Sequence, residues 1–407
     1  MSSFVTGLES AIDGTVLPHD QLQTMHAGRP LWVRYDLDAI AKAVSRDDLV
    51  KREPTLWRYR ELLPVERDEN IVSLGEGMTP LIECPRLGKE LGLSRLVIKD
   101  ESQLPTGSFK SRGLCMAVSR AKELGVTRLA IPTAGNAGGA MAAYAARAGI
   151  EAFVFMPADT PAVNRYEAAL FGAKVFLVDG LINDCGALVH RGADELGWFD
   201  CSTLKEPYRI EGKKTMGLEL AEQLDWTLPD AIFYPTGGGT GLIGMWKAFN
   251  ELEHIGWLNN PSRPRMYACQ SDGCAPIVTA FDAGERHAEP FPDPATIASG
   301  LRVPKALGDF MILDAVRESK GKALAAPEAD VLAWMRKAIA LEGISICPET
   351  AVCLSALSTS VKNGDIDADE LVVVFNTGAV QKYVEAMECD LPSLPAKGQI
   401  DWAAVIG

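Results

Sequence analysis

The chain has 407 residues, 47% of them hydrophobic, and a formal net charge of -14. This length and composition predict a large core divided among two or more domains. The acidity argues against nucleic acid and anionic membranes as main partners. The nine cysteines are scattered without a CxxC pair, which favours reduced thiols in a cytoplasmic protein and no metal site. We find no apolar stretch of about 18 residues, so no membrane span is predicted, and no secretory signal at the start.

The predicted elements begin with a helix over residues 38–49 in a lead segment that otherwise has mixed signals. From about residue 95 onward, short apolar runs alternate with amphipathic stretches. The predicted strands cover residues 96–99, 128–132, 152–156, 174–178, 231–234, 265–268 and 371–375, and the helices between them cover 111–124, 137–148, 181–196, 215–223 and 242–252. This alternation, with nearly all-apolar strands, predicts a parallel sheet covered by helices on both faces. Residues 282–294 are the predicted surface loop.

The first candidate catalytic residue is Lys110, which ends the segment Pro-Thr-Gly-Ser-Phe-Lys. This turn of small residues brings the lysine to the start of a predicted helix. An amine held there can form a Schiff base with an aldehyde cofactor and so act as a covalent catalyst. Taken by itself, the segment leaves open the alternative of a surface lysine beside a helix start.

Two glycine-rich loops follow predicted strands. The first comprises Thr133, Ala134, Gly135, Asn136 and Ala137, and the second comprises Thr236, Gly237, Gly238, Gly239, Thr240 and Gly241. Backbone N–H groups at a helix start suit an anion, so the first loop is predicted to bind a carboxylate and the second a phosphate. The Asn136 amide could also bond a phenolic oxygen, or only cap its helix. The second loop also matches a dinucleotide fingerprint, with Asp272 as its acidic residue.

Thr377 follows the predicted strand 371–375 in an Asn-Thr-Gly turn. Its hydroxyl could meet a ring nitrogen without protonating it, although such a turn ends many strands. One amine, a phosphate loop, a carboxylate loop and this hydroxyl together predict pyridoxal phosphate as the cofactor. A dinucleotide site would leave Lys110 and the Asn136 loop without a role. Glu349 is expected only to cap the helix that follows it.

Several segments in family order resemble the threonine synthase family of fold-type-II pyridoxal-phosphate enzymes, over residues 30–385. They are Gly-Glu-Gly-Met-Thr-Pro-Leu at 75–81, the Lys110 segment, Tyr-Arg-Ile-Glu-Gly-Lys-Lys-Thr at 208–215, Ser-Gly-Leu-Arg-Val-Pro at 299–304 and Asn-Thr-Gly at 376–378. The resemblance implies two open parallel twisted sheets flanked by helices, as in the tryptophan synthase beta fold. It implies a lead segment (1–70), a large cofactor-binding domain (71–110 and 206–390), a small mobile domain (111–205) and a tail (391–407).

The resemblance also implies a role for each candidate residue. Lys110 becomes the Schiff-base lysine, Asn136 lies near the 3′-oxygen of the cofactor, residues 237–241 surround its phosphate and Thr377 meets its pyridine nitrogen. Arg209 resembles the arginine that binds the substrate phosphate. A homodimer is implied as well. The lead segment is similar to a zinc-ribbon lead whose cysteines are absent here, so no zinc is predicted.

Departures from the family pattern bear on the reaction. Ser111, Ala137, the triple glycine and Leu204 stand where threonine synthases carry polar residues, and the Asn136 and triple-glycine loops are similar to those of threonine and serine dehydratases. The leading hypothesis is therefore β-elimination of a threonine- or serine-like amino acid to a 2-oxo acid and ammonia. Threonine synthase, acting on O-phosphohomoserine, is the alternative. Ala134 replaces the serine of related racemases, which argues against racemisation.

Two hypotheses from other classes remain open. A nicotinamide dehydrogenase would use the fingerprint over residues 239–244, and a non-catalytic cofactor-binding protein would keep the phosphate loop without turnover. Residues 378–382 also depart from the usual family ending, so the sequence does not define the geometry around the pyridine.

Overall fold

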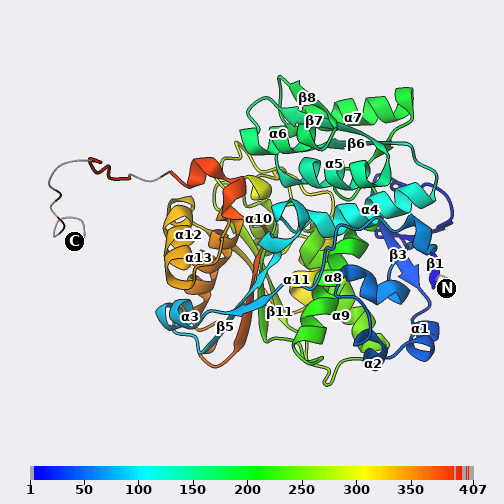
Figure 1. Cartoon of the computed structure of the whole chain (residues 1–407). Helices are drawn as coiled ribbons and strands as arrows, with labels where there is room; N and C mark the ends of the chain where they lie inside the picture. The colour runs from blue at the N-terminus through cyan, green and yellow to red at the C-terminus, as the bar shows by residue number, and fades with distance from the viewer. Residues whose placement is uncertain (1–3, 389–390, 397–399, 401, 403–407) are drawn as a thin grey trace.

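The computed structural model describes residues 4–388, 391–396, 400 and 402 (Figure 1). The first three residues, where we expected no secretory signal, and most of the predicted tail 391–407 lie outside this part of the chain. The described strands form a three-stranded, a six-stranded and a four-stranded sheet. Among the described residues, no helix is long and apolar enough to cross a membrane.

The six-stranded sheet has the order β12-β11-β10-β13-β5-β4. Its strands are β4 (Leu81–Glu83), β5 (Arg95–Asp100), β10 (Ala231–Pro235), β11 (Arg265–Ser271), β12 (Ala323–Ala326) and β13 (Leu371–Asn376). All neighbouring pairs are parallel except β4 with β5. The loops that follow the parallel strands therefore leave the sheet at one edge, which is where ligands bind in open α/β sheets.

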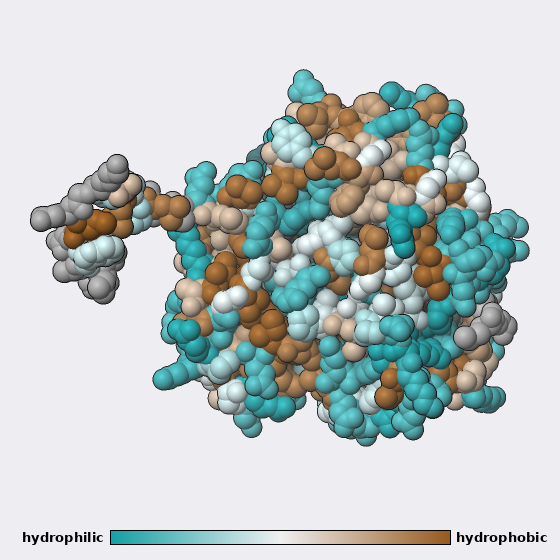
Figure 2. Space-filling model, viewed as in Figure 1, coloured by the Kyte–Doolittle hydropathy of each residue, from teal (hydrophilic) through white to brown (hydrophobic). Residues whose placement is uncertain are grey.

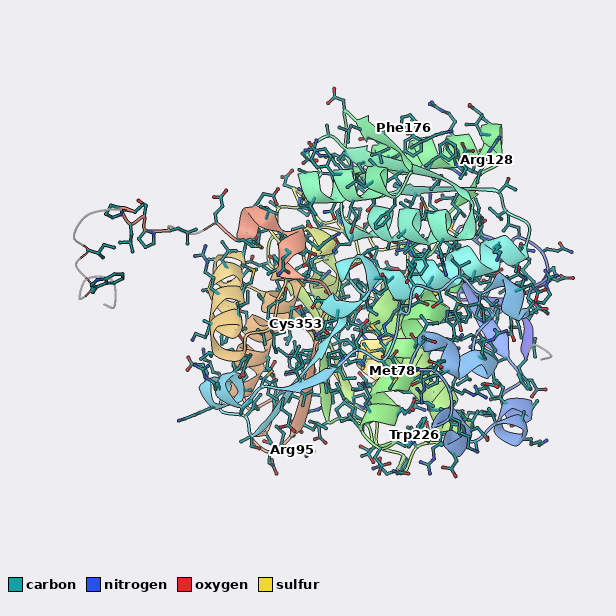
Figure 3. The ribbon with its side chains drawn as sticks, viewed as in Figure 1. Met78, Arg95, Arg128, Phe176, Trp226 and Cys353 are labelled. Atoms are coloured by element: carbon teal, nitrogen blue, oxygen red, sulfur yellow. The ribbon has the colours of Figure 1, made fainter. Side chains whose placement is uncertain are left out.

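Helices cover both faces of this sheet, and β13 shows how the sequence directs them. Because side chains alternate along a strand, Val373 and Phe375 join one core while Val372 and Val374 join another. The first core includes α8 (Tyr208–Gln223), α9 (Thr240–His254), α10 (Pro276–Asp282) and α11 (Asp309–Glu318); the second includes α3 (Pro85–Leu91), α12 (Glu328–Glu342) and α13 (Pro348–Lys362). Figure 3 labels Cys353 on α13, in the second core.

The four-stranded parallel sheet has the order β8-β7-β6-β9 and lies at the top of Figure 1. Its strands are β6 (Arg128–Pro132), β7 (Glu151–Pro157), β8 (Lys174–Val178) and β9 (Phe199–Asp200), and its helices are α5 (Asn136–Ala148), α6 (Ala162–Leu170) and α7 (Ile182–Leu196). The predicted coverage by helices is incomplete at the edge strand β8, where Phe176 (labelled in Figure 3) and Leu177 are 45% and 52% exposed. Figure 2 likewise shows hydrophobic residues interspersed among hydrophilic ones on the visible face.

The lead segment forms a small antiparallel sheet of β1 (Val5–Ser10), β2 (Val16–Leu17) and β3 (Leu31–Tyr35), which the sequence did not predict. It shares a core with α4 (Lys110–Glu123) and α5. The helix predicted over residues 38–49 is two short helices, α1 (Leu37–Ala43) and α2 (Arg46–Leu49). They separate at Ser45, whose backbone N–H donates to the Asp48 carboxylate at 2.8 Å and so begins a new helix.

The predicted fold class is confirmed: two mainly parallel sheets are each flanked by helices. All seven predicted strands are present, with ends that shift by up to three residues. Helix α8 begins at Tyr208, two turns before the predicted start at Thr215. It lacks a polar face because almost its whole length is buried, so periodicity does not reveal its start. The domain boundaries stay a prediction.

Candidate active site

Three loops meet at the carboxyl edge of the large sheet. Strands β5 and β13 are neighbours, and the segments that follow them stay paired. The Phe109 N–H donates to the Thr377 carbonyl at 3.0 Å, and the Ala379 N–H donates to the Gly107 carbonyl at 2.9 Å. This backbone pairing places Lys110 beside the Asn-Thr-Gly turn, although residues 110 and 377 are far apart in the sequence.

Lys110 is the first residue of α4, and its Nζ lies 4.4 Å from the centroid of the Phe109 ring. Burial of the ammonium group, followed by the positive charge of Arg209, lowers the pKa of Lys110 to about 8, while Glu349 opposes the shift. Desolvation disfavours the charged form of an amine. A considerable fraction of Lys110 is therefore neutral, and so nucleophilic, near neutral pH.

A second lysine, Lys213 on α8, is fully buried beside the first. Its Nζ donates to the Phe109 carbonyl and lies 3.9 Å from the centroid of the same ring. Burial, and then the charges of Lys110 and Arg209, hold the pKa of Lys213 well below its ordinary value. Lys213 belongs to the segment 208–215 of the family resemblance, but no sequence pattern placed it beside Lys110.

The glycine-rich loop lies between β10 and α9. Within the described part of the chain, the N–H groups of Gly237, Gly238 and Gly239 donate to no protein acceptor. Gly239 has a φ of 74° and is the N-cap of α9, whose first-turn N–H groups have no partner in the helix. Backbone donors that converge at a helix N-terminus suit a phosphate, and the phosphate-binding role of this loop stays a prediction.

The loop from Thr133 to Ala137 joins β6 to α5. Its shape is fixed by Thr133, whose Oγ1 accepts from the Gly135 N–H at 3.1 Å. The region beside Gly135 is open, because a Cβ atom there would meet nothing within 4 Å. Asn136 does not cap α5; its Nδ2 donates to the Tyr383 hydroxyl at 3.2 Å. The helix-cap alternative is thereby excluded, and the loop retains donors that suit a carboxylate.

Thr377 and Asn376 have different roles at the end of β13. The Asn376 side chain is a buried structural link, since its Nδ2 donates to Asp100 at 2.8 Å and its Oδ1 accepts from Thr350 at 2.9 Å. Among the described residues, the Thr377 hydroxyl has a single long contact, of 3.7 Å to the Cys347 sulfur. It can therefore still bond a ligand in the site.

Arg209 lies in the first turn of α8 and is 1% exposed. One guanidinium nitrogen donates to the Cys201 carbonyl at 2.8 Å, and Nε has no hydrogen-bond partner among the described residues. The nearby Glu206 carboxylate accepts from the Tyr208 and Arg209 N–H groups. Burial raises the pKa of Glu206 to about 7, against the opposing charge of Arg209. Arg209 is thus a desolvated cation, and the carboxyl group with the strongest influence on it, Glu206, is only partly ionised at neutral pH.

Sequence reasoning missed two site residues, Tyr383 and Glu349. Glu349 does not cap its helix, so that expectation is wrong; its Oε1 instead accepts from the Gly300 N–H at 2.8 Å. No motif marked Tyr383. Asp272, the acidic residue of the dinucleotide alternative, accepts from the Glu328 N–H at 2.9 Å and so supports the start of α12.

These residues fit pyridoxal phosphate. The Ser108 hydroxyl is buried without a partner among the described residues, and the Asn136 Oδ1 is likewise unpaired. Both lie beside Gly378, which forms a backbone bridge with Ser108. Unsatisfied buried polar atoms call for a ligand or water. An amine, a phosphate loop and a threonine hydroxyl complete the donor set that the cofactor requires.

Comparison with known proteins also supports pyridoxal phosphate as the cofactor. Residues 72–378 match the family model described as pyridoxal-phosphate dependent enzyme. The chain is 36% identical to a threonine synthase of Methanocaldococcus jannaschii over 91% of this chain and 93% of that protein. A threonine synthase of Mycobacterium bovis is 33% identical over 83% and 90% of the two chains.

Solved structures share the fold at lower identity. Maize serine racemase superposes with a TM-score of 0.64 at 24% identity, covering 74% of this chain and 88% of that one. A processed threonine deaminase from Solanum lycopersicum gives a TM-score of 0.64 at 19% identity, covering 92% and 98%. Both likenesses agree with the predicted fold-type-II architecture. The chain belongs to the pyridoxal-phosphate-dependent enzyme family.

Proposed function

We propose that the protein is a threonine synthase, which converts O-phosphohomoserine to threonine and phosphate. The named relatives support this reaction, since threonine synthases match at 33–36% identity over most of both chains. The preference derived from the sequence is therefore reversed: β-elimination was the leading hypothesis, and the comparisons favour its alternative.

The observation that carries the proposal is the buried positive cluster of Arg209, Lys213 and Lys110. Arg209 and Lys213 are each at most 1% exposed. The hydrogen bonds that their side chains make go to the backbone carbonyls of Cys201 and Phe109. Burying a cation such as Arg209 without an equal negative charge is unfavourable, and the same burial lowers the pKa of both lysines. An anion that enters the site would offset this cost and favour the charged form of the lysines. A substrate phosphate, in addition to the cofactor phosphate on the glycine-rich loop, would supply that charge.

The chemistry follows from the positions of this chain's own groups. Pyridoxal phosphate, when bound, supplies the electron sink for a carbanion formed at the substrate's α-carbon. The backbone N–H groups around Asn136 would hold the substrate carboxylate, and Arg209 would hold its phosphate. Lys110, with a pKa of about 8, would move protons at the substrate's carbon atoms. The Thr377 hydroxyl would bond the ring nitrogen and leave it largely unprotonated.

β-Elimination of a threonine- or serine-like amino acid remains the second candidate, because one observation favours it. Leu204, which precedes Arg209 by five residues in the sequence, is 1% exposed and packs in the large apolar core. It offers no hydrogen bond where threonine synthases carry a serine. Ala137 and the triple glycine likewise offer no side-chain donor. A free β-hydroxyl needs no second phosphate site, so these residues suit it.

The test is to offer the purified holoenzyme O-phosphohomoserine, threonine and serine in separate reactions. Threonine and inorganic phosphate in equal amounts from the first substrate would support the proposal. A 2-oxo acid and ammonia from threonine or serine, with no phosphate released from the first substrate, would overturn it in favour of β-elimination. Arg209→Met sharpens the comparison, because it should impair only the phosphorylated substrate. Lys205→Met, which removes the partly exposed cation paired with Asp200, is the matched control.

A homodimer and a cytoplasmic location stay predictions of this proposal, and sedimentation of the purified protein tests the first. The dehydrogenase alternative predicts a colourless protein that binds reduced nicotinamide cofactor. The non-catalytic alternative predicts a coloured protein that turns over none of these substrates.

A further inference from the structure

The segment after β13 brings a tyrosine onto the Asn136 loop. Tyr383 is 8% exposed, and its hydroxyl accepts a hydrogen bond of 3.2 Å from the Asn136 Nδ2. The adjacent Lys382 makes a second contact in the same direction, an ion pair of 2.5 Å with Glu167 on α6. The segment thus connects the large sheet to the helices that flank the small one.

Glu349 acts on the Tyr383 hydroxyl as a second partner besides Asn136. Its carboxylate is 3% exposed and is anchored by the Gly300 N–H. Burial, and then the charge of Glu349 together with a hydrogen bond to it, raises the pKa of Tyr383 well above its ordinary value. The phenol therefore keeps its proton. The second Glu349 oxygen, Oε2, is buried without a hydrogen-bond partner among the described residues. Because a carboxylate can only accept, we infer that the Tyr383 O–H turns toward this oxygen.

The direction of this bond determines the direction of the next one. A hydroxyl that has donated its single proton can only accept from a further partner. Asn136 must therefore turn its NH₂ group, and not its carbonyl, toward Tyr383. Asparagine amides can rotate by half a turn at little steric change, and the hydrogen-bond network decides between the two orientations. An Asn136 amide held in this way retains one N–H that Tyr383 does not use.

We propose that Tyr383 and Glu349 are positioning residues that fix the orientation of the Asn136 amide, so that its second N–H donates to the phenolic oxygen of bound pyridoxal phosphate. This inference rests on the proposed placement of the cofactor beside Asn136. Without the tyrosine hydroxyl, the amide is free to rotate and to present its carbonyl to that oxygen. Two acceptors would then face each other, and the cofactor would bind less tightly.

The experiment uses Tyr383→Phe, which keeps the ring and removes only the hydroxyl. We expect its affinity for pyridoxal phosphate to fall roughly tenfold. At one fixed pH, less of the bound cofactor should absorb in the visible band and more in the near-ultraviolet band, since the phenolic oxygen holds its proton more tightly. Tyr267→Phe is the matched control. It removes the hydroxyl of another buried tyrosine, on β11, whose contact is a 3.5 Å bond to the Asp365 carbonyl between α13 and β13.

Glu349→Gln provides an independent measurement if Tyr383→Phe folds poorly. The glutamine amide can donate to the Tyr383 hydroxyl and so reverse the direction of the hydrogen bonds from residue 349 through Tyr383 to Asn136. Its effect on the ratio of the two bands should have the same sign. In the double variant the two effects should be far from additive, because both act through one amide. Unchanged affinity and spectrum in Tyr383→Phe, or additive effects in the double variant, would overturn the inference. A wild-type protein that binds no cofactor would instead refute the proposed function.

Discussion

Lys110 and Lys213 face one aromatic ring: their Nζ atoms lie 4.4 Å and 3.9 Å from the centroid of Phe109. A ring stabilises a nearby cation only modestly, so it does not offset the burial that lowers the pKa of both lysines. The two amines differ in their bonds, because Lys213 donates to the Phe109 carbonyl while no hydrogen bond from Lys110 is found among the described residues. Lys110 is thus the amine that remains available for covalent chemistry.

Replacing Lys110 by alanine should abolish both covalent cofactor attachment and turnover. The reason is that the other lysines beside this turn are engaged: Lys213 donates to the Phe109 carbonyl, and Lys382 forms an ion pair with Glu167. Absorbance in the visible region, and the mass of the protein after borohydride reduction, measure the attachment. Lys213→Met is the control and should still retain cofactor after reduction. Cofactor that stays attached to the Lys110→Ala protein would contradict the assignment.

The rate at which the apoprotein captures pyridoxal phosphate should depend on pH with a midpoint near 8. The pKa of Lys110 is lowered to about 8, so the neutral, nucleophilic amine predominates above that pH and is lost as the pH falls below it. An ordinary lysine would give a midpoint near its pKa of about 10.4. Stopped-flow absorbance measures the rate. Arg209→Met should move the midpoint upward, because one of the charges that lower the pKa is gone, whereas Arg286→Met on the surface should leave it unchanged.

The glycine and small-residue loops explain why so much of this site could be predicted. The Lys110 turn and the loop over residues 236–241 each follow an apolar strand directly, and parallel strands bring the ends of their loops to one edge. Local sequence therefore determined both the chemistry and the place. The same reasoning found every strand of five or more residues in the two larger sheets. It missed β4, β9 and β12 of those sheets, which have three, two and four residues and too few side chains to show a period, and it missed the small sheet of the lead segment.

Tyr383, Glu349 and Lys213 could not be placed from the sequence because their roles depend on contacts across the fold. Tyr383 meets Asn136 over a separation of 247 residues, and Lys213 meets Phe109 over 104. No local sequence pattern indicates contacts between residues so far apart in the chain. Glu349 in addition follows a proline at a helix start, where the local rule predicts a cap, and the tertiary contact with Gly300 overrides that rule.

Binding of an anion to Arg209 should become weaker as the pH rises through about 7. The pKa of Glu206 is raised to about 7, so this carboxyl group is neutral below that pH and leaves the charge of Arg209 unopposed. Above it, the carboxylate competes with an anionic ligand. Sulfate is a suitable probe, since its own charge is constant in this range. Calorimetry should show roughly tenfold tighter binding at pH 6 than at pH 8.

The variant Glu206→Gln tests the cause of this pH dependence. Glutamine keeps an oxygen that can accept from the Tyr208 and Arg209 N–H groups and has no charge to titrate. Sulfate binding should therefore be tight at both pH values. A wild-type-like loss of affinity at pH 8 in this variant would assign the effect to another group.

The buried charge cluster around Arg112 supports the helix that carries Lys110, and its disruption should unfold the protein more readily. Arg112 is fully buried and donates to Glu101 and Glu219, both at 2.8 Å, and to Thr215 at 3.0 Å. In Arg112→Met, two buried carboxylates lose their main cation. Breaking a buried ion pair on one side typically destabilises a protein by about 3–5 kcal/mol. Urea denaturation of the apoprotein, followed by tryptophan fluorescence, measures the change.

Arg286→Met is the matched control, because it removes an arginine whose ion pair with Asp314 is exposed. A pair of that kind contributes about 0–1 kcal/mol. The variant Arg112→Met/Glu101→Gln should recover part of the lost stability, since one of the two uncompensated charges is then removed as well. Equal midpoints for Arg112→Met and Arg286→Met would show that the cluster does not stabilise the fold. Lys110 would then owe its position to the backbone pairing of residues 107–109 with residues 377–379 alone.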